Sequence, residues 1–163
     1  MCIRDRLSKP PHRLRLSYGA IKTVLQDSGI TKPNIQQVSK AVIKIRSEKL
    51  PDPREIGNAG SFFKNPVIEM KLFSRLRQSY PTIPNYPQPE GTIKLPAAWL
   101  IEQCGWKGKR VGDTGTYQHH ALIIVNHGKA TGIEILKCSE KIQKAVLKKF
   151  GVKIVPEIRV DFL

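Results

Sequence analysis

The ten residues Gly57-Asn58-Ala59-Gly60-Ser61-Phe62-Phe63-Lys64-Asn65-Pro66 place small and polar side chains between a helical segment and an aromatic one. Gly57 and Gly60 allow the backbone to adopt a positive φ or to approach a ligand closely. Ser61 and Asn65 supply a hydroxyl and a carboxamide. Two interpretations fit the composition: a turn that leads into an aromatic strand, or a binding site built around the serine.

The residues before this stretch indicate a helix. Apolar side chains recur at helical spacing over 35–45, and Thr31 is the expected N-cap. Pro51 ends this helix, so we expect Ser61 on a loop or at the start of a strand. Further upstream, apolar and polar residues alternate over 14–18, which predicts a half-buried strand.

The residues after the stretch predict helices and strands in mixture. A helix is expected over 67–79, and the proline-rich segment 80–89 is expected to be an extended loop. The nearly continuous apolar run 121–126 is typical of a buried strand. Thr131 opens a capping-box sequence for a helix over 132–149. These elements together predict an α+β fold with a mixed sheet and flanking helices.

The charge calls for an anionic partner. The chain of 163 residues carries 28 Lys and Arg against 13 Asp and Glu, a formal net charge of +15. A nucleic acid, a membrane surface or a phosphorylated substrate would each satisfy this excess. The basic residues are dispersed without a run of five or six like charges, which favours solvated helix faces. Nucleic-acid binding therefore stays an alternative, and our prediction is that the chain binds none.

Cysteine usage and hydropathy indicate the compartment. Three cysteines without metal-ligand or redox spacing predict neither a disulfide framework nor a metal site, and a reducing cytosol suits them. The first residues lack the apolar core of a signal peptide, and no apolar run approaches the ~20 residues of a membrane span. We expect a soluble cytoplasmic protein without a membrane association.

Several stretches of the chain, together with the ten-residue stretch, form a recognisable pattern in this order: Ser17-Tyr18-Gly19, Lys49-Leu50-Pro51-Asp52-Pro53, Asn85-Tyr86-Pro87-Gln88, Lys94 to Cys104, Ala121 to Asn126, and Pro156-Glu157-Ile158-Arg159. This pattern resembles UDP-N-acetylenolpyruvoylglucosamine reductase, the MurB-type UDP-N-acetylmuramate dehydrogenase. The loop and segment around Tyr86 resemble the type I enzymes, in which such a tyrosine closes over bound substrate.

The resemblance implies a division of the chain into four parts. Residues 1–6 match nothing in the family and are expected to be an extension foreign to the enzyme. Residues 7–50 resemble the end of a split second FAD-binding domain of the PCMH-like type, and residues 51–150 the substrate-binding domain. Residues 151–163 are expected to form a terminal strand that returns to the flavin region. The resemblance implies enzymes about twice as long as this sequence, so we expect the N-terminal FAD-binding half to lie outside it.

The resemblance also implies a reaction. In this family NADPH reduces a bound FAD, and the flavin then passes hydride to the enolpyruvyl group of UDP-N-acetylglucosamine enolpyruvate, a step of peptidoglycan synthesis. Ser61 is implied as the proton donor and Glu157 as the residue that stabilises the enolic intermediate. A glutamate that donates a hydrogen bond must be protonated, which burial or anionic neighbours favour. Without the resemblance, Glu157 reads as a surface carboxylate paired with Arg159 or a lysine.

The remaining site residues carry over from the family as contacts to substrate or flavin. His120 stands where the family usually has glutamine, and as a neutral imidazole it could take the place of the amide. Taken alone, each of these residues reads as core or solvated surface. The implied substrate contacts are Tyr18, Lys49, Asn65, Tyr86, Lys94 and His120, the implied flavin contacts are Gly60 and Arg159, and no metal ligand is implied.

Two functional classes remain open from the sequence. The chain works as the reductase, as a monomer, only when the FAD-binding half is present, or it is a catalytically inactive substrate-binding remnant without FAD. Flavin absorbance of the purified chain separates the two.

Overall fold

The computed structural model describes residues 9–17 and 19–160. The chain divides into two compact units, Met1–Lys49 and Leu50–Leu163. The first six residues, Cys2 among them, and the predicted site residue Tyr18 lie outside the described residues.

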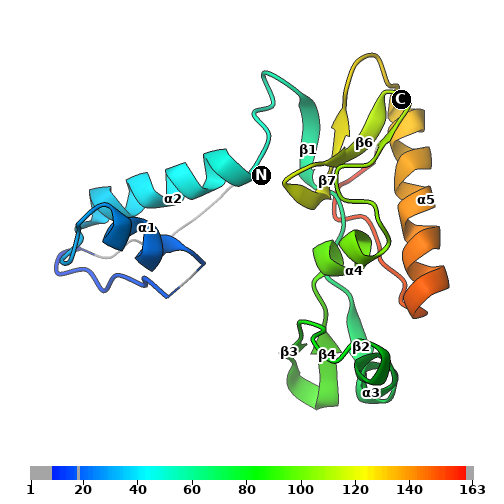
Figure 1. Cartoon of the computed structure of the whole chain (residues 1–163), viewed down its shortest axis with the longest axis horizontal. Helices are drawn as coiled ribbons and strands as arrows, with labels where there is room; N and C mark the ends of the chain where they lie inside the picture. The colour runs from blue at the N-terminus through cyan, green and yellow to red at the C-terminus, as the bar shows by residue number, and fades with distance from the viewer. Residues whose placement is uncertain (1–8, 18, 161–163) are drawn as a thin grey trace. The chain divides into compact units, whose positions relative to one another are not determined.

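The first unit contains helices α1 (Ile21–Asp27) and α2 (Ile35–Lys49), which pack on each other through Ile21, Leu25 and Ala41 (Figure 1). The N-cap of α2 is not Thr31 as predicted. The Asn34 N–H donates to Gln37 Oε1 and the Gln37 N–H donates to Asn34 Oδ1, both at 2.9 Å. This reciprocal pair satisfies the first turn, because an asparagine at the N-cap accepts from N3 as a serine or threonine would.

The strand predicted over 14–18 is not found in the described residues 14–17, which have no regular structure. A strand needs a partner for its backbone groups, and the two helices of this unit offer none.

The second unit combines two sheets with three helices and one 3₁₀ turn, which confirms the α+β prediction. Its elements are β1 (Gly57–Ser61), β2 (Val67–Glu69), α3 (Met70–Ser79), β3 (Tyr86–Pro87), η1 (Pro89–Gly91), β4 (Thr92–Lys94), α4 (Ala97–Gln103), β5 (Arg110–Val111), β6 (Thr114–Tyr117), β7 (His120–Asn126) and α5 (Gly132–Phe150).

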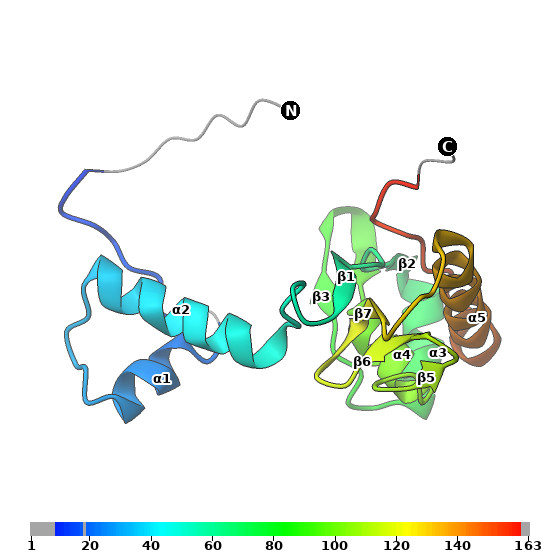
Figure 2. The same cartoon turned by 90° about the horizontal axis from the view of Figure 1, so that it is seen from above.

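The larger sheet has the strand order β1-β7-β6-β5, and α4 and α5 pack against it. Figure 1 shows α5 running along this sheet, and Figure 2 shows the same layering from above. Strand β7 is buried at its five central residues and half-buried at its two ends, which agrees with the buried strand that the apolar run 121–126 predicts. The core beneath it includes Leu100 and Ile101 of α4 and Ile142 and Val146 of α5, each fully buried.

The smaller sheet has the order β2-β4-β3, and α3 packs beside β2 and β4. Every strand pair in both sheets is antiparallel, where the sequence predicted a mixed sheet. The helix predicted over 67–79 begins only at Met70, because Val67, Ile68 and Glu69 pair with β4 instead. The β-branched residues Val67 and Ile68 are compatible with a strand as well as with a helix. Their pairing with β4 selects the strand.

Helix α5 begins and ends as predicted. The Thr131 hydroxyl accepts from the Glu134 N–H, and the Glu134 carboxylate accepts from the Thr131 N–H (2.7 Å), which completes the capping box. The hydrogen bond from the Thr131 N–H, followed by one from the Thr131 hydroxyl (2.9 Å), lowers the pKa of the Glu134 carboxyl. Gly151 ends the helix with a φ of 66°, a left-handed conformation that glycine adopts without strain.

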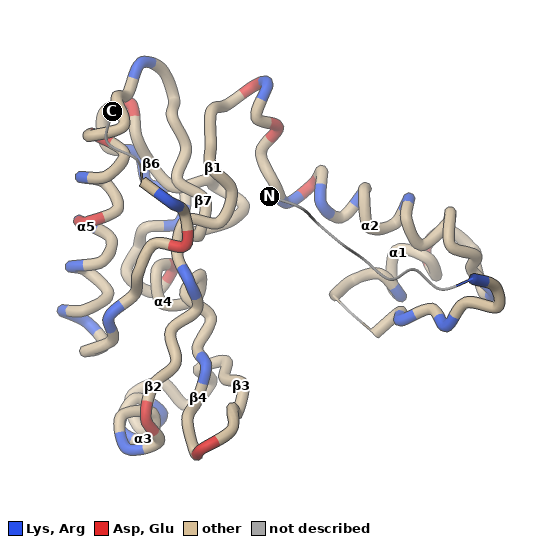
Figure 3. The backbone as a smooth tube through the Cα atoms, turned by 180° about the vertical axis from the view of Figure 1, so that it is seen from behind, with Lys and Arg blue, Asp and Glu red and all other residues tan. Residues whose placement is uncertain are grey.

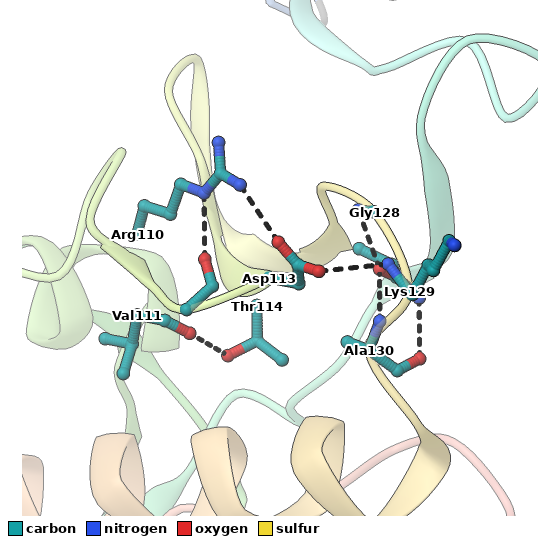
Figure 4. Close-up of polar contacts among 9 residues, drawn as sticks. Arg110, Val111, Asp113, Thr114, Gly128, Lys129 and Ala130 are labelled. Carbon is teal, nitrogen blue, oxygen red and sulfur yellow. Dashed lines mark hydrogen bonds and ion pairs between the residues drawn. The ribbon is translucent and has the colours of Figure 1, made fainter.

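A polar cluster joins the β5–β6 turn to the loop after β7 (Figure 4). Asp113 accepts from Arg110 Nη2 (3.0 Å) with one carboxylate oxygen and from the Lys129 N–H (3.1 Å) with the other. The Lys129 N–H and then the Arg110 guanidinium lower the pKa of this carboxyl. The backbone of Gly128 approaches the Asp113 carboxylate so closely that a Cβ on residue 128 would lie 2.8 Å from Asp113 Oδ2. The cluster therefore determines how the chain passes from β7 into α5.

Candidate substrate-binding site

The ten-residue stretch is held by two buried rings at its centre. Phe62 and Phe63 are each 1% exposed, and their ring centroids lie 5.2 Å apart in the main core. Burying each ring stabilises the fold by about 1.5–3 kcal/mol. Because the rings point inward, Ser61 before them and Lys64 and Asn65 after them remain exposed.

A β-bulge turns Ser61 relative to the strand before it. Asn58 pairs with Val125 and Ser61 pairs with Ile123, so three steps along β1 match two along β7. Gly60, with a φ of 71°, takes up the extra residue, and Asn58 Oδ1 accepts from its N–H at 3.0 Å. Bulges of this kind redirect the next side chain. The Ser61 hydroxyl makes no hydrogen bond to the other described residues, so it is available to a ligand.

The C-terminal segment pairs with the same stretch. The Glu157 N–H donates to the Phe62 carbonyl (2.8 Å), and the Lys64 N–H donates to the Val155 carbonyl (2.9 Å). Pro156 lies opposite Phe63 in this antiparallel bridge, at a position where the missing N–H is not needed. In place of the predicted final strand there is only this bridge within residues 151–160. It nevertheless brings Glu157 beside the residue that follows Ser61.

A pocket of about 330 Å³ opens at this junction. Among the predicted site residues, Asn65, Lys94 and Glu157 line it together. Ser61 is not among the lining residues and precedes Lys64 by three positions. The residues that line the pocket are Lys64, Asn65, Val67, Gln88, Lys94 and Glu157.

Strand register brings Tyr86 and Lys94 to one face of the smaller sheet. Lys94 lies directly opposite Val67 on one neighbour and opposite Tyr86 on the other. Side chains directly opposite each other in an antiparallel sheet share a face. Ile93, the next residue of β4, points to the other face and is 2% exposed, so the face with Lys94 is the one away from the core. Tyr86 is 57% exposed there.

Asn65 has a structural role that the sequence did not indicate. Its Oδ1 accepts from the Ala97 N–H at 2.8 Å, across 32 residues of sequence. Pro96 is the N-cap residue of α4 and has no side-chain acceptor, so Asn65 supplies one. Only the Nδ2 group of Asn65, which makes no hydrogen bond among the described residues, is left for a ligand.

Glu157 is exposed, and its charged neighbours in the pocket are Lys64 and Lys94. Glu157 is the one carboxylate among the lining residues. The net charge of the lining is positive, which suits an anionic ligand.

The other predicted residues lie elsewhere. Lys49 ends α2 in the first unit, whereas the pocket is built from the second. His120 begins β7 opposite Tyr117 and does not line the pocket, and its Nδ1 accepts a long hydrogen bond from the Leu122 N–H (3.4 Å). Arg159 is exposed on the C-terminal segment.

Sequence reasoning missed three of the lining residues: Lys64, Val67 and Gln88. Lys64 lies within the ten-residue stretch and directly precedes Asn65, a predicted site residue, so its position in the sequence could have indicated it. Gln88 donates from Nε2 to the carbonyls of Tyr86 (3.3 Å) and Pro87 (2.9 Å), so it holds the loop that carries the tyrosine.

The two predicted flavin contacts are not among the residues that line the pocket. Gly60 is half-buried within the bulge and Arg159 lies on the C-terminal segment, and neither lines the pocket.

Other kinds of site find little support in the described part of the chain. There, no group of three or more His, Cys, Asp or Glu side chains could hold a metal ion. None of the helices described is both long and apolar enough to cross a membrane. Lys and Arg recur along α2 and α5 and are not gathered in one run (Figure 3).

The fold is a small α+β domain, and its pocket has a basic, partly polar lining. The C-terminal domain of UDP-N-acetylenolpyruvoylglucosamine reductase, as a family model, matches residues 52–160. The chain belongs to this family, as the sequence resemblance indicated.

Curated relatives named UDP-N-acetylenolpyruvoylglucosamine reductase agree with this assignment. The protein from Porphyromonas gingivalis is 51% identical over 144 residues, which cover 88% of this chain and 42% of the relative. The protein from Flavobacterium johnsoniae is 47% identical over 155 residues, 95% of this chain and 46% of the relative. The chain thus spans less than half the length of these relatives. A solved structure of the reductase from Thermus caldophilus matches with 22% identity and a TM-score of 0.43, over 74% of this chain and 32% of that one.

Proposed function

We propose that the chain is the substrate-binding part of a UDP-N-acetylenolpyruvoylglucosamine reductase, an oxidoreductase of peptidoglycan synthesis in the cytoplasm. Its substrate would be UDP-N-acetylglucosamine enolpyruvate. The observation that carries the proposal is the convergence of Asn65, Lys94 and Glu157, from three separate segments, on one pocket within the family match.

Different residues of the pocket and its surroundings would contact different groups of the substrate. The Lys94 ammonium would meet a phosphate oxygen as a point charge, and Tyr86 on the same face would donate its hydroxyl. Asn65 would donate from Nδ2 while its oxygen remains bound to α4. These contacts would orient the enolpyruvyl end of the substrate toward Ser61 and Glu157.

At the reacting end, Ser61 Oγ would deliver a proton to the α-carbon, and the Glu157 carboxyl would stabilise the enolic intermediate. Serine is a poor acid in water, so this role requires a hydroxyl positioned by its backbone, as the bulge at Gly60 provides. FAD, reduced by NADPH and held by an FAD-binding half outside the residues present, would supply the hydride.

The isolated chain would bind substrate and have no turnover. We would titrate the purified chain calorimetrically with UDP-N-acetylglucosamine enolpyruvate and record its visible spectrum. We expect saturable binding, no flavin absorbance, and affinity lowered roughly tenfold or more by Lys94→Met, because hydrogen bonds to charged groups contribute about 1.5–3 kcal/mol.

Lys71→Met is the matched control, since Lys71 is exposed on α3 and does not line the pocket. Absence of saturable binding, or an equal effect of the two substitutions, would remove the support for a substrate-binding role.

A further inference from the structure

Two lysines from different segments line the same pocket. Lys64 belongs to the link between β1 and β2, and Lys94 ends β4. Within the described residues, neither ammonium group forms an ion pair, because the ion pairs found there join Arg54 to Asp52, Lys107 to Glu102 and Arg110 to Asp113. Glu157 is the carboxylate in the lining, and it lies beyond ion-pair distance of both lysines.

Two ammonium groups that line one pocket repel each other, and this repulsion would grow as a ligand displaced solvent. An anion between them removes this repulsion and accepts hydrogen bonds from both. A ligand with two adjacent anionic groups makes the best use of such a pair.

The backbone of Lys64 is held on both sides. Its N–H donates to the Val155 carbonyl, Phe63 before it is buried, and Asn65 after it is bound to the start of α4. The Cα position is therefore rigid, and only the side chain has to be ordered when a ligand binds.

We propose that Lys64 is a further substrate-binding residue, which together with Lys94 holds the diphosphate of the nucleotide sugar. This inference rests on the proposed function and deepens it. The family resemblance assigns Lys94 to the substrate but not Lys64, which is identified by its place in the pocket.

Two probes test the proposal, inorganic pyrophosphate and UDP-N-acetylglucosamine enolpyruvate, each titrated into the full chain. The substitution is Lys64→Met, which keeps the apolar stem of the side chain and removes its charge. We expect both affinities to fall roughly tenfold, the size of one lost charge-assisted hydrogen bond. Lys64→Arg should retain most of the binding, and Lys71→Met on α3 should leave it unchanged.

The two probes separate the two proposals. If the substrate binds and Lys64→Met behaves like Lys71→Met, the role of Lys64 is refuted and the proposed function stands. If pyrophosphate binds with the expected loss in Lys64→Met but the nucleotide sugar does not bind, the two-lysine anion site stands and the proposed function fails. If neither probe binds the unsubstituted chain, both proposals are overturned.

Discussion

Replacing Asn65 should separate a structural role from a binding role, because its two polar atoms face different partners. Oδ1 accepts from the Ala97 N–H at 2.8 Å, and Nδ2 makes no hydrogen bond among the described residues. Asn65→Ala removes both. The lost helix cap should cost about 1 kcal/mol of unfolding free energy, within the range of roughly 0.5–2 kcal/mol for caps. For a domain of this size that lowers Tm by about 4 °C.

Asn65→Asp keeps an acceptor oxygen at the same place. Its negative charge at the first turn of α4 is favourable, so Tm should stay close to that of the unsubstituted chain. The same charge in a pocket meant for phosphate should weaken binding of UDP-N-acetylglucosamine enolpyruvate more than Asn65→Ala does. Thermal unfolding followed by circular dichroism gives the first quantity, and calorimetric titration gives the second.

A matched control is Asn34→Ala, which removes the cap of α2 in the other unit and should not change binding to the pocket. The reasoning is refuted if Asn65→Asp unfolds at as low a temperature as Asn65→Ala, or if Asn65→Ala leaves Tm unchanged.

Three further predictions concern stability. Gly115→Ala should abolish folding or lower Tm sharply, since its Cβ would lie 2.6 Å from the Lys109 carbonyl oxygen; soluble expression with an unchanged Tm would contradict this. Leu100→Ala should lower the free energy of unfolding by about 2–5 kcal/mol, measured in urea, because Leu100 is fully buried beneath β7. Hydrogen bonds from Arg54 lower the pKa of Asp52 to about 2, so its contribution is complete above the unfolded value of 3.8 and is lost as the pH falls through about 2. The denaturation midpoints of the unsubstituted chain and Asp52→Asn should therefore differ at neutral pH and converge in that acid window, and a constant difference would count against the prediction.

Local sequence signals predicted the local structure well. The capping box at Thr131, the glycine at 151 and the apolar run 121–126 each depend on neighbours in sequence, and each is found in the structure. The predicted start of the helix at Val67 was wrong. Whether residues 67–69 form a helix or a strand depends on pairing with β4, which begins 25 residues later in the chain. Thr31 was wrong because two acceptable caps lay three residues apart and the side chain of Gln37 favoured Asn34.

The candidate site was predictable only through the resemblance. Nothing near Asn65 indicates that its oxygen caps a helix 32 residues away, and nothing near Glu157 indicates that it pairs beside Phe62. Long-range pairings of this kind are decided by packing. The place of Lys64 in the pocket likewise became visible only once β4 and the C-terminal segment lay beside it.

The pairing of Glu157 with the Phe62 carbonyl also sets an order of events during protein synthesis. Residue 157 is polymerised about 95 residues after residue 62, a delay of roughly 5–20 s at roughly 5–20 residues per second. During that interval the chain contains Lys64 and Asn65 but not yet Glu157. A ribosome-bound chain that ends before residue 155 should therefore carry the serine, Asn65 and Lys94 but only part of the pocket, and it should gain affinity for the nucleotide sugar only after the C-terminal segment has emerged.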